Sequence, residues 1–236
     1  MSVVAPGNHV ASVRYVPKPG KSSTRQAETA PTLVLFVRHG TTPTTGAVLP
    51  GRAKGLHLAE RGVEQATAVA SRIGELNKVS AVYASPLERT RETAAPIARA
   101  TGNRVRTDRS LLECDFGSWT GAKLSELRKR TEWVTIQQAP SRFRFPGGES
   151  FPEMQVRITS GVDRLVANHP GQTIVAVSHA DPIKAVAAQA LGTPLDLFQR
   201  IVVSPCSVTA ILYGSGAPVV LAVNSTGNDL GTLVPS

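Results

Sequence analysis

The chain has 236 residues, of which 41% are hydrophobic and 18% are charged, a balance typical of a folded globular protein and not of a disordered one. No stretch approaches the roughly 20 consecutive apolar residues of a membrane-spanning helix, so no membrane partner is expected. The formal net charge of +9 is compatible with an anionic partner, but only 5% of the residues are aromatic, which disfavours a stacking surface, and we expect no nucleic-acid partner.

The first segment in chain order, residues 1–31, has no sustained periodicity. It contains basic residues with a single acid, and prolines interrupt it. It lacks the apolar run of a signal peptide. We therefore expect a flexible basic tail, or sequence upstream of the true start codon, followed by a single domain at residues 32–236 in the cytoplasm.

From residue 32 onward, short apolar runs alternate with stretches of helical periodicity. The apolar runs predict strands at residues 33–37, 79–84, 173–177, 201–212 and 219–223. The periodic stretches predict helices at residues 60–76, 85–100, 150–168 and 181–191. This alternation predicts one α/β domain with three layers, in which a mostly parallel central sheet is covered by helices on both faces.

Local signals indicate where the helices begin and which of their sides is buried. Ser85 with Glu88, and Ser150 with Glu153, form capping-box patterns, so Ser85 and Ser150 are expected to cap helices. Val63 opens an apolar stripe along the first helix and is expected to be buried.

The two cysteines, Cys114 and Cys206, are too few for a zinc site of their own. No histidine lies near either of them at metal-ligand spacing. We expect two buried thiols in a reducing compartment, with a disulfide left open.

Three of the predicted strands are followed by residues that suit a phosphoryl group. Arg38 and His39 follow the first strand, Arg89 lies just after the second, and His179 comes after the third. Because ligands of open α/β sheets bind at the carboxyl ends of strands, these side chains are expected to converge. Guanidinium forks match phosphoryl oxygens, a neutral imidazole is a nucleophile, and a second imidazole, if protonated, would add a donor. The set suits the transfer of a phosphoryl group, with two arginines in place of a metal ion.

Such a transfer also needs a carboxylic acid that protonates the leaving oxygen. Glu113 is the candidate, and Asp115 is the neighbour that could compete for the role. Each residue alone is a weak signal, since a lone histidine is more often a structural group than a catalyst. His9, His57 and His169 lack a comparable setting and are expected to play no part in the site.

The motif Arg38-His39-Gly40-Thr41 resembles the signature of the histidine phosphatase superfamily, the phosphoglycerate mutase-like proteins. Further blocks of that family follow in the expected order at residues 51–58, Gly62, 65–66, 85–94, Leu112-Glu113 with Gly117, Trp119 and Gly121, 146–150, and Ser178-His179. So many ordered blocks make the resemblance specific over residues 33–191, whereas one short motif would not. It implies the phosphoglycerate mutase-like fold, with residues 32–236 as a single histidine phosphatase-like catalytic domain.

The resemblance also implies a role for each candidate. His39 would be the catalytic nucleophile, phosphorylated during turnover, and Glu113 the proton donor. Arg38, Arg89 and the second catalytic histidine, His179, would form the phosphate pocket together with His39. No metal or organic cofactor would be required. Because the acid must start protonated and His39 neutral, we expect a pH optimum on the acidic to neutral side.

The chain departs from the family pattern at three positions. Thr41 and Thr45 stand where members often have glutamate and asparagine, although the Thr45 hydroxyl could still bind phosphate. Ala180 follows the second histidine, where many members have glycine. None of these changes removes a reacting group.

The acid block, residues 113–119, resembles the phosphatase branch of the family, and the stretch from residue 119 to 146 is short for a mutase. We therefore expect a metal-independent phosphatase that hydrolyses small phosphomonoesters through a phosphohistidine intermediate, its partner being a small phosphorylated metabolite. Two alternatives stay open: a phosphoglycerate mutase-type phosphotransferase, and a non-catalytic basic module that binds phosphate or nucleic acid, which the net charge favours.

Specificity is expected to come from residues 116–145, which would form a lid over the site. Their aromatic side chains include Trp119, Trp133 and Phe143, for each of which ordinary packing is an equal alternative. Residues 201–223 could supply an edge strand for a homodimer, and the sequence names neither the substrate nor the oligomeric state.

Overall fold

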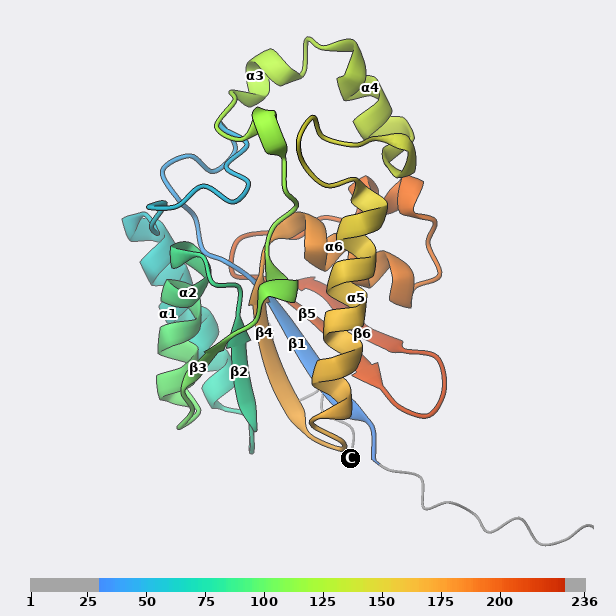
Figure 1. Ribbon diagram of the computed structural model, residues 1–236. Coiled ribbons are helices and arrows are strands. Elements are labelled where there is room, and N and C mark those ends of the chain that lie inside the picture. The colour runs from blue at the N-terminus through green and yellow to red at the C-terminus, as the bar shows by residue number, and fades with distance from the viewer. Residues whose placement is uncertain (1–29, 228–236) are drawn as a thin grey trace, which may run out of the picture.

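The computed structural model describes residues 30–227, which fold around a six-stranded sheet (Figure 1). The strands lie in the order β3-β2-β4-β1-β5-β6, with bounds β1 Thr32–Arg38, β2 Ala81–Ala84, β3 Val105–Thr107, β4 Thr173–Ser178, β5 Val208–Tyr213 and β6 Val219–Ser225. The first four strands pair in parallel, whereas β5 and β6 are antiparallel to their neighbours. The predicted α/β fold with a mostly parallel sheet is confirmed.

Helices cover both faces of this sheet (Figure 1). They are α1 Glu60–Gly74, α2 Glu88–Ala100, α3 Leu124–Leu127, α4 Thr131–Gln138, α5 Phe151–Ala167 and α6 Ala180–Ala190, with short 3-10 helices η1 Arg109–Leu111, η2 Gly117–Trp119, η3 Pro140–Arg142 and η4 Leu195–Arg200. Gly102 adopts a positive φ just past the end of α2, and the predicted capping box of Ser150 and Glu153 is present at the start of α5.

The sheet has two hydrophobic cores because successive side chains of a strand point to opposite faces. Leu33 and Leu35 of β1 belong to the core that includes buried residues of α1 and α2. Val34 and Phe36 of the same strand belong to the core that includes residues of α5 and α6. Burial on both faces explains the uninterrupted apolar run of β1.

The segment that was predicted to form a lid contains α3 and α4, which lie beyond the carboxyl ends of the strands (Figure 1). Its aromatic side chains pack against one another, with ring centroids 5.5 Å apart for Trp119 and Phe143 and 4.9 Å apart for Phe143 and Phe145. Phe145 in turn contacts Phe151 at the start of α5, and Trp133 packs against the same core. Ordinary packing, the alternative to a lid role, therefore describes these aromatic residues.

One predicted boundary was wrong, one strand was missed, and one side chain is exposed instead of buried, each for an identifiable reason. The strand predicted from residue 201 begins only at Val208, because the chain turns before it and Cys206 adopts a left-handed φ of 55°. Strand β3 was missed, since it has three residues and carries no apolar run. Val63 is 54% exposed because Gly62, the preceding residue, occupies the buried side of α1.

Three expectations concern the chain as a whole. The predicted basic tail and His9 lie outside the described residues, apart from the last two positions of that segment, so its flexibility stays a prediction. Within residues 30–227, no helix has the length and apolar character needed to cross a membrane. Cys114 and Cys206 are buried free thiols, as expected.

Candidate active site

The two histidines meet because their strands are neighbours. β1 and β4 run in parallel with Arg38 opposite Ser178, so His39 and His179, the next residue of each strand, leave the sheet side by side. The backbone N–H of His39 donates to the carbonyl of Ser178 at 3.0 Å. The ring centroids of the two histidines lie 5.2 Å apart with the rings inclined at 62°.

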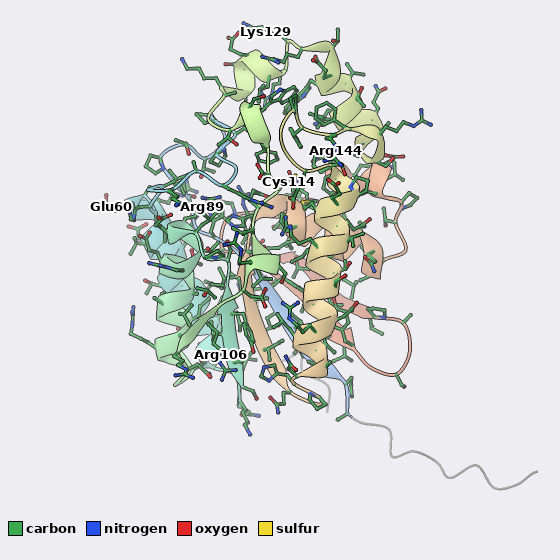
Figure 2. All side chains as sticks on the ribbon, in the orientation of Figure 1. Glu60, Arg89, Arg106, Cys114, Lys129 and Arg144 are labelled. Carbon is green, nitrogen blue, oxygen red and sulfur yellow. The ribbon has the colours of Figure 1, made fainter. Side chains whose placement is uncertain are left out.

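Arg89 reaches the same place from the first turn of α2 and is fully buried. Figure 2 shows it near the carboxyl ends of the strands, at the end of the sheet that faces α3 and α4. Its Nη2 donates to the carbonyl of Gly51 at 2.7 Å and lies 3.2 Å from Nδ1 of His179. Since a guanidinium group only donates, Nδ1 of His179 must accept, which places the ring hydrogen on Nε2.

The hydrogen on Nε2 of His179 points to Ser85, whose Oγ lies 2.9 Å away. The prediction that Ser85 caps α2 was therefore wrong. The backbone N–H of Ser85 donates to the carbonyl of Val177, which continues the pairing of β2 with β4 by one residue. Helix α2 starts only at Glu88, with Leu87 as its N-cap. The side chain of Ser85 holds the second histidine instead.

Both arginines keep unused donors in this buried region. Nε and Nη1 of Arg89 and Nε of Arg38 are buried and have no hydrogen-bond partner among residues 30–227. Arg38 is otherwise fixed by a 2.7 Å bond from Nη1 to the carbonyl of Val203. A buried donor without a partner is costly, and more so on a charged group, so these N–H groups are suited to the oxygens of an anion.

His39 is neutral at physiological pH. Burial, and then repulsion by Arg89 and Arg38, lowers its pKa to about 3. Nδ1 lies 2.8 Å from the carbonyl of Gly40, an acceptor, so Nδ1 carries the hydrogen and Nε2 keeps its lone pair. A neutral imidazole held in this tautomer is equipped to act as a nucleophile.

The protonation state of His179 differs from the one considered in the sequence analysis, where a protonated second imidazole would add a donor. Burial, followed by repulsion from Arg89, lowers the pKa of His179 well below its usual range. The ring is therefore neutral and donates through Nε2 alone.

Glu113 is buried, and its Oε1 accepts a hydrogen bond from the N–H of Cys114 at 2.9 Å. Burial, and then repulsion by Asp181, raises the pKa of Glu113 to about 7, although Arg89 and Arg38 act in the opposite direction. The group can therefore both give and take a proton near neutrality. The competing carboxylate of Asp115 turns to Arg52, with 3.3 Å between Oδ2 and Nη1.

Part of this set borders a cavity of about 390 Å³. Arg38, His39 and Glu113 line it together with Thr45, whereas Arg89 and His179 are fully buried next to His39. The Thr45 hydroxyl accepts from the N–H of Thr42 at 2.8 Å and lies 3.0 Å from the Thr42 hydroxyl, so it also shapes its own loop. Phe116 and Leu124 are the contributions of residues 116–145 to the lining.

The family described as "Histidine phosphatase superfamily (branch 1)" matches residues 34–226. The chain belongs to this superfamily.

Two relatives and two solved structures place it further. It is 33% identical over 213 residues to a bifunctional protein of Mycobacterium tuberculosis, covering 85% of this chain and 56% of the relative, so it spans about half the length of that relative. It is 31% identical to phosphoserine phosphatase 1 of Hydrogenobacter thermophilus, covering 75% and 85% of the two chains. The YhfR protein of Bacillus stearothermophilus superimposes with a TM-score of 0.76 at 27% identity, over 84% of this chain and 99% of that one. For a phosphoserine phosphatase of Entamoeba histolytica, solved in complex with 3-phosphoglyceric acid, the TM-score is 0.72 at 25% identity, over 83% and 98%.

Close packing explains why two positions of the superfamily blocks, Gly40 and Gly62, are glycines. A Cβ added to Gly40 would lie 2.5 Å from the carbonyl oxygen of Gly62, and one added to Gly62 would lie 2.1 Å from that of Thr41. The loop after β1 thus rests directly on the start of α1. Gln65, one turn further, accepts from the N–H of Thr41 at 2.9 Å. These contacts fix the backbone on either side of His39.

Gly62→Ala is accordingly expected to lower the free energy of unfolding by about 1–3 kcal/mol, because either the helix or the loop of His39 must move. Urea unfolding followed by circular dichroism measures this loss. Gly216→Ala is the matched control, since a Cβ there meets nothing within 4 Å. Equal stability of the two variants would contradict the packing argument.

Sequence reasoning missed two charged residues of the cavity, Asp181 and Lys184. They pair at 3.3 Å, and Nζ of Lys184 also donates to Oε1 of Gln199 at 3.0 Å. The signal was present, because His179 is the N-cap of α6 and the first turn of that helix must lie beside the site.

The other two histidines among residues 30–227, His57 and His169, do not line the cavity. Nε2 of His169 lies 2.9 Å from the hydroxyl of Tyr83, and its Nδ1 lies 2.9 Å from Oε1 of Gln172, a structural arrangement. His57 forms an exposed ion pair with Glu92. Within the described part of the chain, no group of three or more histidine, cysteine, aspartate or glutamate residues is arranged to hold a metal ion.

Proposed function

We propose that this protein is a metal-independent phosphatase that hydrolyses small phosphomonoesters through a phosphohistidine. The observation that carries the proposal is the neutral ring of His39, which is under the electrostatic influence of two arginines with unused donors and shares a cavity with Glu113, whose pKa is about 7. The two guanidinium groups supply the positive charge that a transferring phosphoryl group requires.

In this reaction the non-bridging oxygens of the substrate bind Arg38 and Arg89. Nε2 of His39 attacks phosphorus, the bond from phosphorus to the leaving oxygen breaks, and Glu113 gives that oxygen its proton. Water then attacks the phosphohistidine while the Glu113 carboxylate takes a proton from it. Phosphate leaves, and His39 and Glu113 return to their starting states.

Relatives named as phosphatases support hydrolysis, and the net charge of +9 is what a binding module would also show. The test is to incubate the full chain with a panel of small phosphomonoesters in the presence of EDTA and to measure inorganic phosphate. 3-Phosphoglycerate is included with and without 2,3-bisphosphoglycerate. Phosphate release supports the proposal. Formation of 2-phosphoglycerate without phosphate release would make the protein a mutase, and phosphate binding without any turnover would make it a binding module.

The pH dependence of kcat/KM should follow the two reacting groups. His39 must be neutral, which holds above its pKa of about 3, and Glu113 must be protonated, which holds below its pKa of about 7. Activity is therefore expected to be highest on the acidic to neutral side and to fall as pH rises through 7.

Asp181→Asn is expected to move that fall to lower pH. The negative charge of Asp181 raises the pKa of Glu113, so its removal lets Glu113 ionise earlier, and the unpaired cation of Lys184 acts in the same direction. The profile of kcat/KM against pH measures the change, with the exposed Asp163→Asn as control. A fall at unchanged or higher pH would contradict this electrostatic relation.

A further inference from the structure

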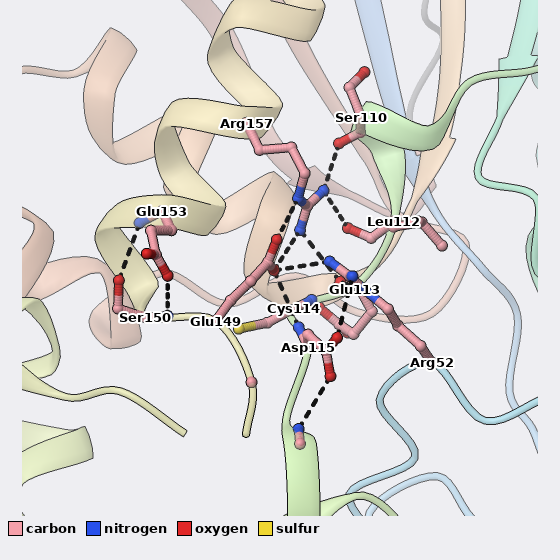
Figure 3. A network of polar contacts seen from close by, with 12 residues as sticks. Arg52, Ser110, Leu112, Glu113, Cys114, Asp115, Glu149, Ser150, Glu153 and Arg157 are labelled. Atoms are coloured by element: carbon pink, nitrogen blue, oxygen red, sulfur yellow. Dashed lines mark hydrogen bonds and ion pairs between the residues drawn. The ribbon is translucent and has the colours of Figure 1, made fainter. Parts of the chain in front are cut away.

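The backbone of the segment that carries Glu113 is held by one side chain of α5. Nη1 of Arg157 donates to the carbonyls of Ser110 at 2.7 Å and Leu112 at 2.9 Å, and Nη2 donates to the carbonyl of Glu113 at 3.2 Å (Figure 3). A single guanidinium group thus spans three carbonyls within four residues of the chain.

Glu149 holds this guanidinium group from the other side. Its Oε1 accepts from Nε of Arg157 at 2.8 Å, and its Oε2 accepts from Nη2 at 2.9 Å. Together with the three carbonyls, these bonds give each of the five N–H donors of an arginine an acceptor. Glu149 also exchanges two hydrogen bonds with the backbone of Asp115. A Cβ on the preceding Gly148 would lie 2.2 Å from the carbonyl oxygen of Asp115, so only glycine permits this approach.

A second arginine completes the arrangement. Nε of Arg52 donates to the carbonyl of Glu113 at 2.9 Å, and its Nη2 lies 2.8 Å from Oε2 of Glu149. The Glu113 carbonyl is therefore held by two guanidinium groups, while the side chain of the same residue lines the cavity. Arg52, Glu149 and Arg157 are referred to below as the acid clamp.

We propose that the acid clamp, and Arg157 above all, positions the general acid: by fixing the Glu113 backbone, it sets where the carboxyl meets the leaving oxygen. This inference rests on the proposed phosphatase function. Arg157 is a positioning residue, since its donors are all used on the protein itself. Lysine cannot replace it, because an ammonium group cannot span three carbonyls and grip both oxygens of Glu149.

A purely structural role for Arg157 would affect every substrate alike, whereas a positioning role depends on the leaving group. Dinitrophenolate leaves without protonation, so phosphorylation of His39 by 2,4-dinitrophenyl phosphate needs the arginines but not a well-placed acid. Glycerol 2-phosphate releases an alkoxide and needs the proton of Glu113. Because kcat/KM covers only the steps up to formation of the phosphohistidine, the ratio of kcat/KM values for these two substrates reports the position of the acid.

The experiment compares Arg157→Met and Arg157→Lys with Arg164→Met, the same change two turns along α5, where the arginine pairs with Asp108. For both Arg157 variants kcat/KM for glycerol 2-phosphate should fall by about 10- to 100-fold while kcat/KM for 2,4-dinitrophenyl phosphate changes by less than about threefold. The alkaline limb of the glycerol 2-phosphate pH profile should also shift. Arg164→Met should leave both kcat/KM values unchanged.

Equal losses on both substrates, or no loss on either, would overturn the inference. If the Arg157 variants do not fold, as judged by circular dichroism, Glu149→Gln is measured in the same way and must show the same selective loss. Failure of the wild-type protein to release phosphate from both substrates would instead refute the proposed function itself.

Discussion

Replacing His39 by alanine is expected to abolish phosphate release, lowering kcat by about 10⁴-fold or more, because the covalent route loses its nucleophile. The two arginines and Glu113 remain in place, so the variant should still bind inorganic phosphate or a substrate. Steady-state assays with 2,4-dinitrophenyl phosphate measure the loss, and this substrate ensures that the proton donor does not limit the rate. Isothermal titration with phosphate measures the retained binding.

The covalent intermediate gives this prediction a second readout. Wild-type protein mixed with substrate and denatured in alkali should carry phosphate on His39, whereas His39→Ala should carry none. His57→Ala, in which the exposed partner of Glu92 is removed, should match the wild type in turnover and in labelling. Retained turnover in His39→Ala, or labelling of another residue, would show that His39 is not the nucleophile.

The grouping of His39 and His179 could be predicted because it depends on a simple property of parallel sheets. Both residues directly follow apolar runs, and neighbouring parallel strands end at the same edge, here with Arg38 opposite Ser178. The burial of β1 on both faces could also be predicted, because its run of apolar residues is uninterrupted. Features that follow from the period of a strand or from a strand end were thus within reach of the sequence.

Other features depend on contacts between segments far apart in the sequence, so they could not be predicted from it. Ser85 has the neighbours of a helix cap, yet it bonds to His179, 94 positions away. Arg52 and Arg157 meet the carbonyl of Glu113 across 61 and 44 positions. No local pattern distinguishes an arginine that holds a backbone carbonyl from one that faces solvent, so the acid clamp required the fold.

The protonation of Glu113 has the same origin in tertiary contacts. The sequence identifies a carboxylic acid, but its pKa of about 7 comes from burial and from Asp181, opposed by Arg89 and Arg38. Burial, together with the same arginines, lowers the pKa of His39 and keeps it neutral. One pair of cations therefore acts on both reacting groups: it helps to keep the nucleophile unprotonated, and it lowers the pKa of Glu113, which eases the release of its proton.

Glu113→Gln is the second variant with a large expected effect. Glutamine keeps the shape of the side chain but cannot transfer a proton, so kcat on glycerol 2-phosphate should fall by about 10²- to 10⁴-fold. The alkaline fall of the pH profile should disappear, because the group that ionises near pH 7 is gone. Asp115→Asn is the matched control, since that carboxylate turns to Arg52 and should be dispensable as an acid.

The two chemical steps respond differently to this variant when the leaving group needs no proton. With 2,4-dinitrophenyl phosphate, Glu113→Gln should still phosphorylate His39, but water attack then lacks its base, so dinitrophenolate should appear in a burst followed by a slow phase. The amplitude of the burst should equal the amount of phosphohistidine recovered after alkaline denaturation. Linear release of dinitrophenolate without a burst would mean that Glu113 is not the base for water attack. Equal falls of kcat/KM for the two substrates would mean that Glu113 does not protonate the leaving oxygen. Either result would contradict the shared acid and base role, because that role predicts both accumulation of the intermediate and dependence on the leaving group.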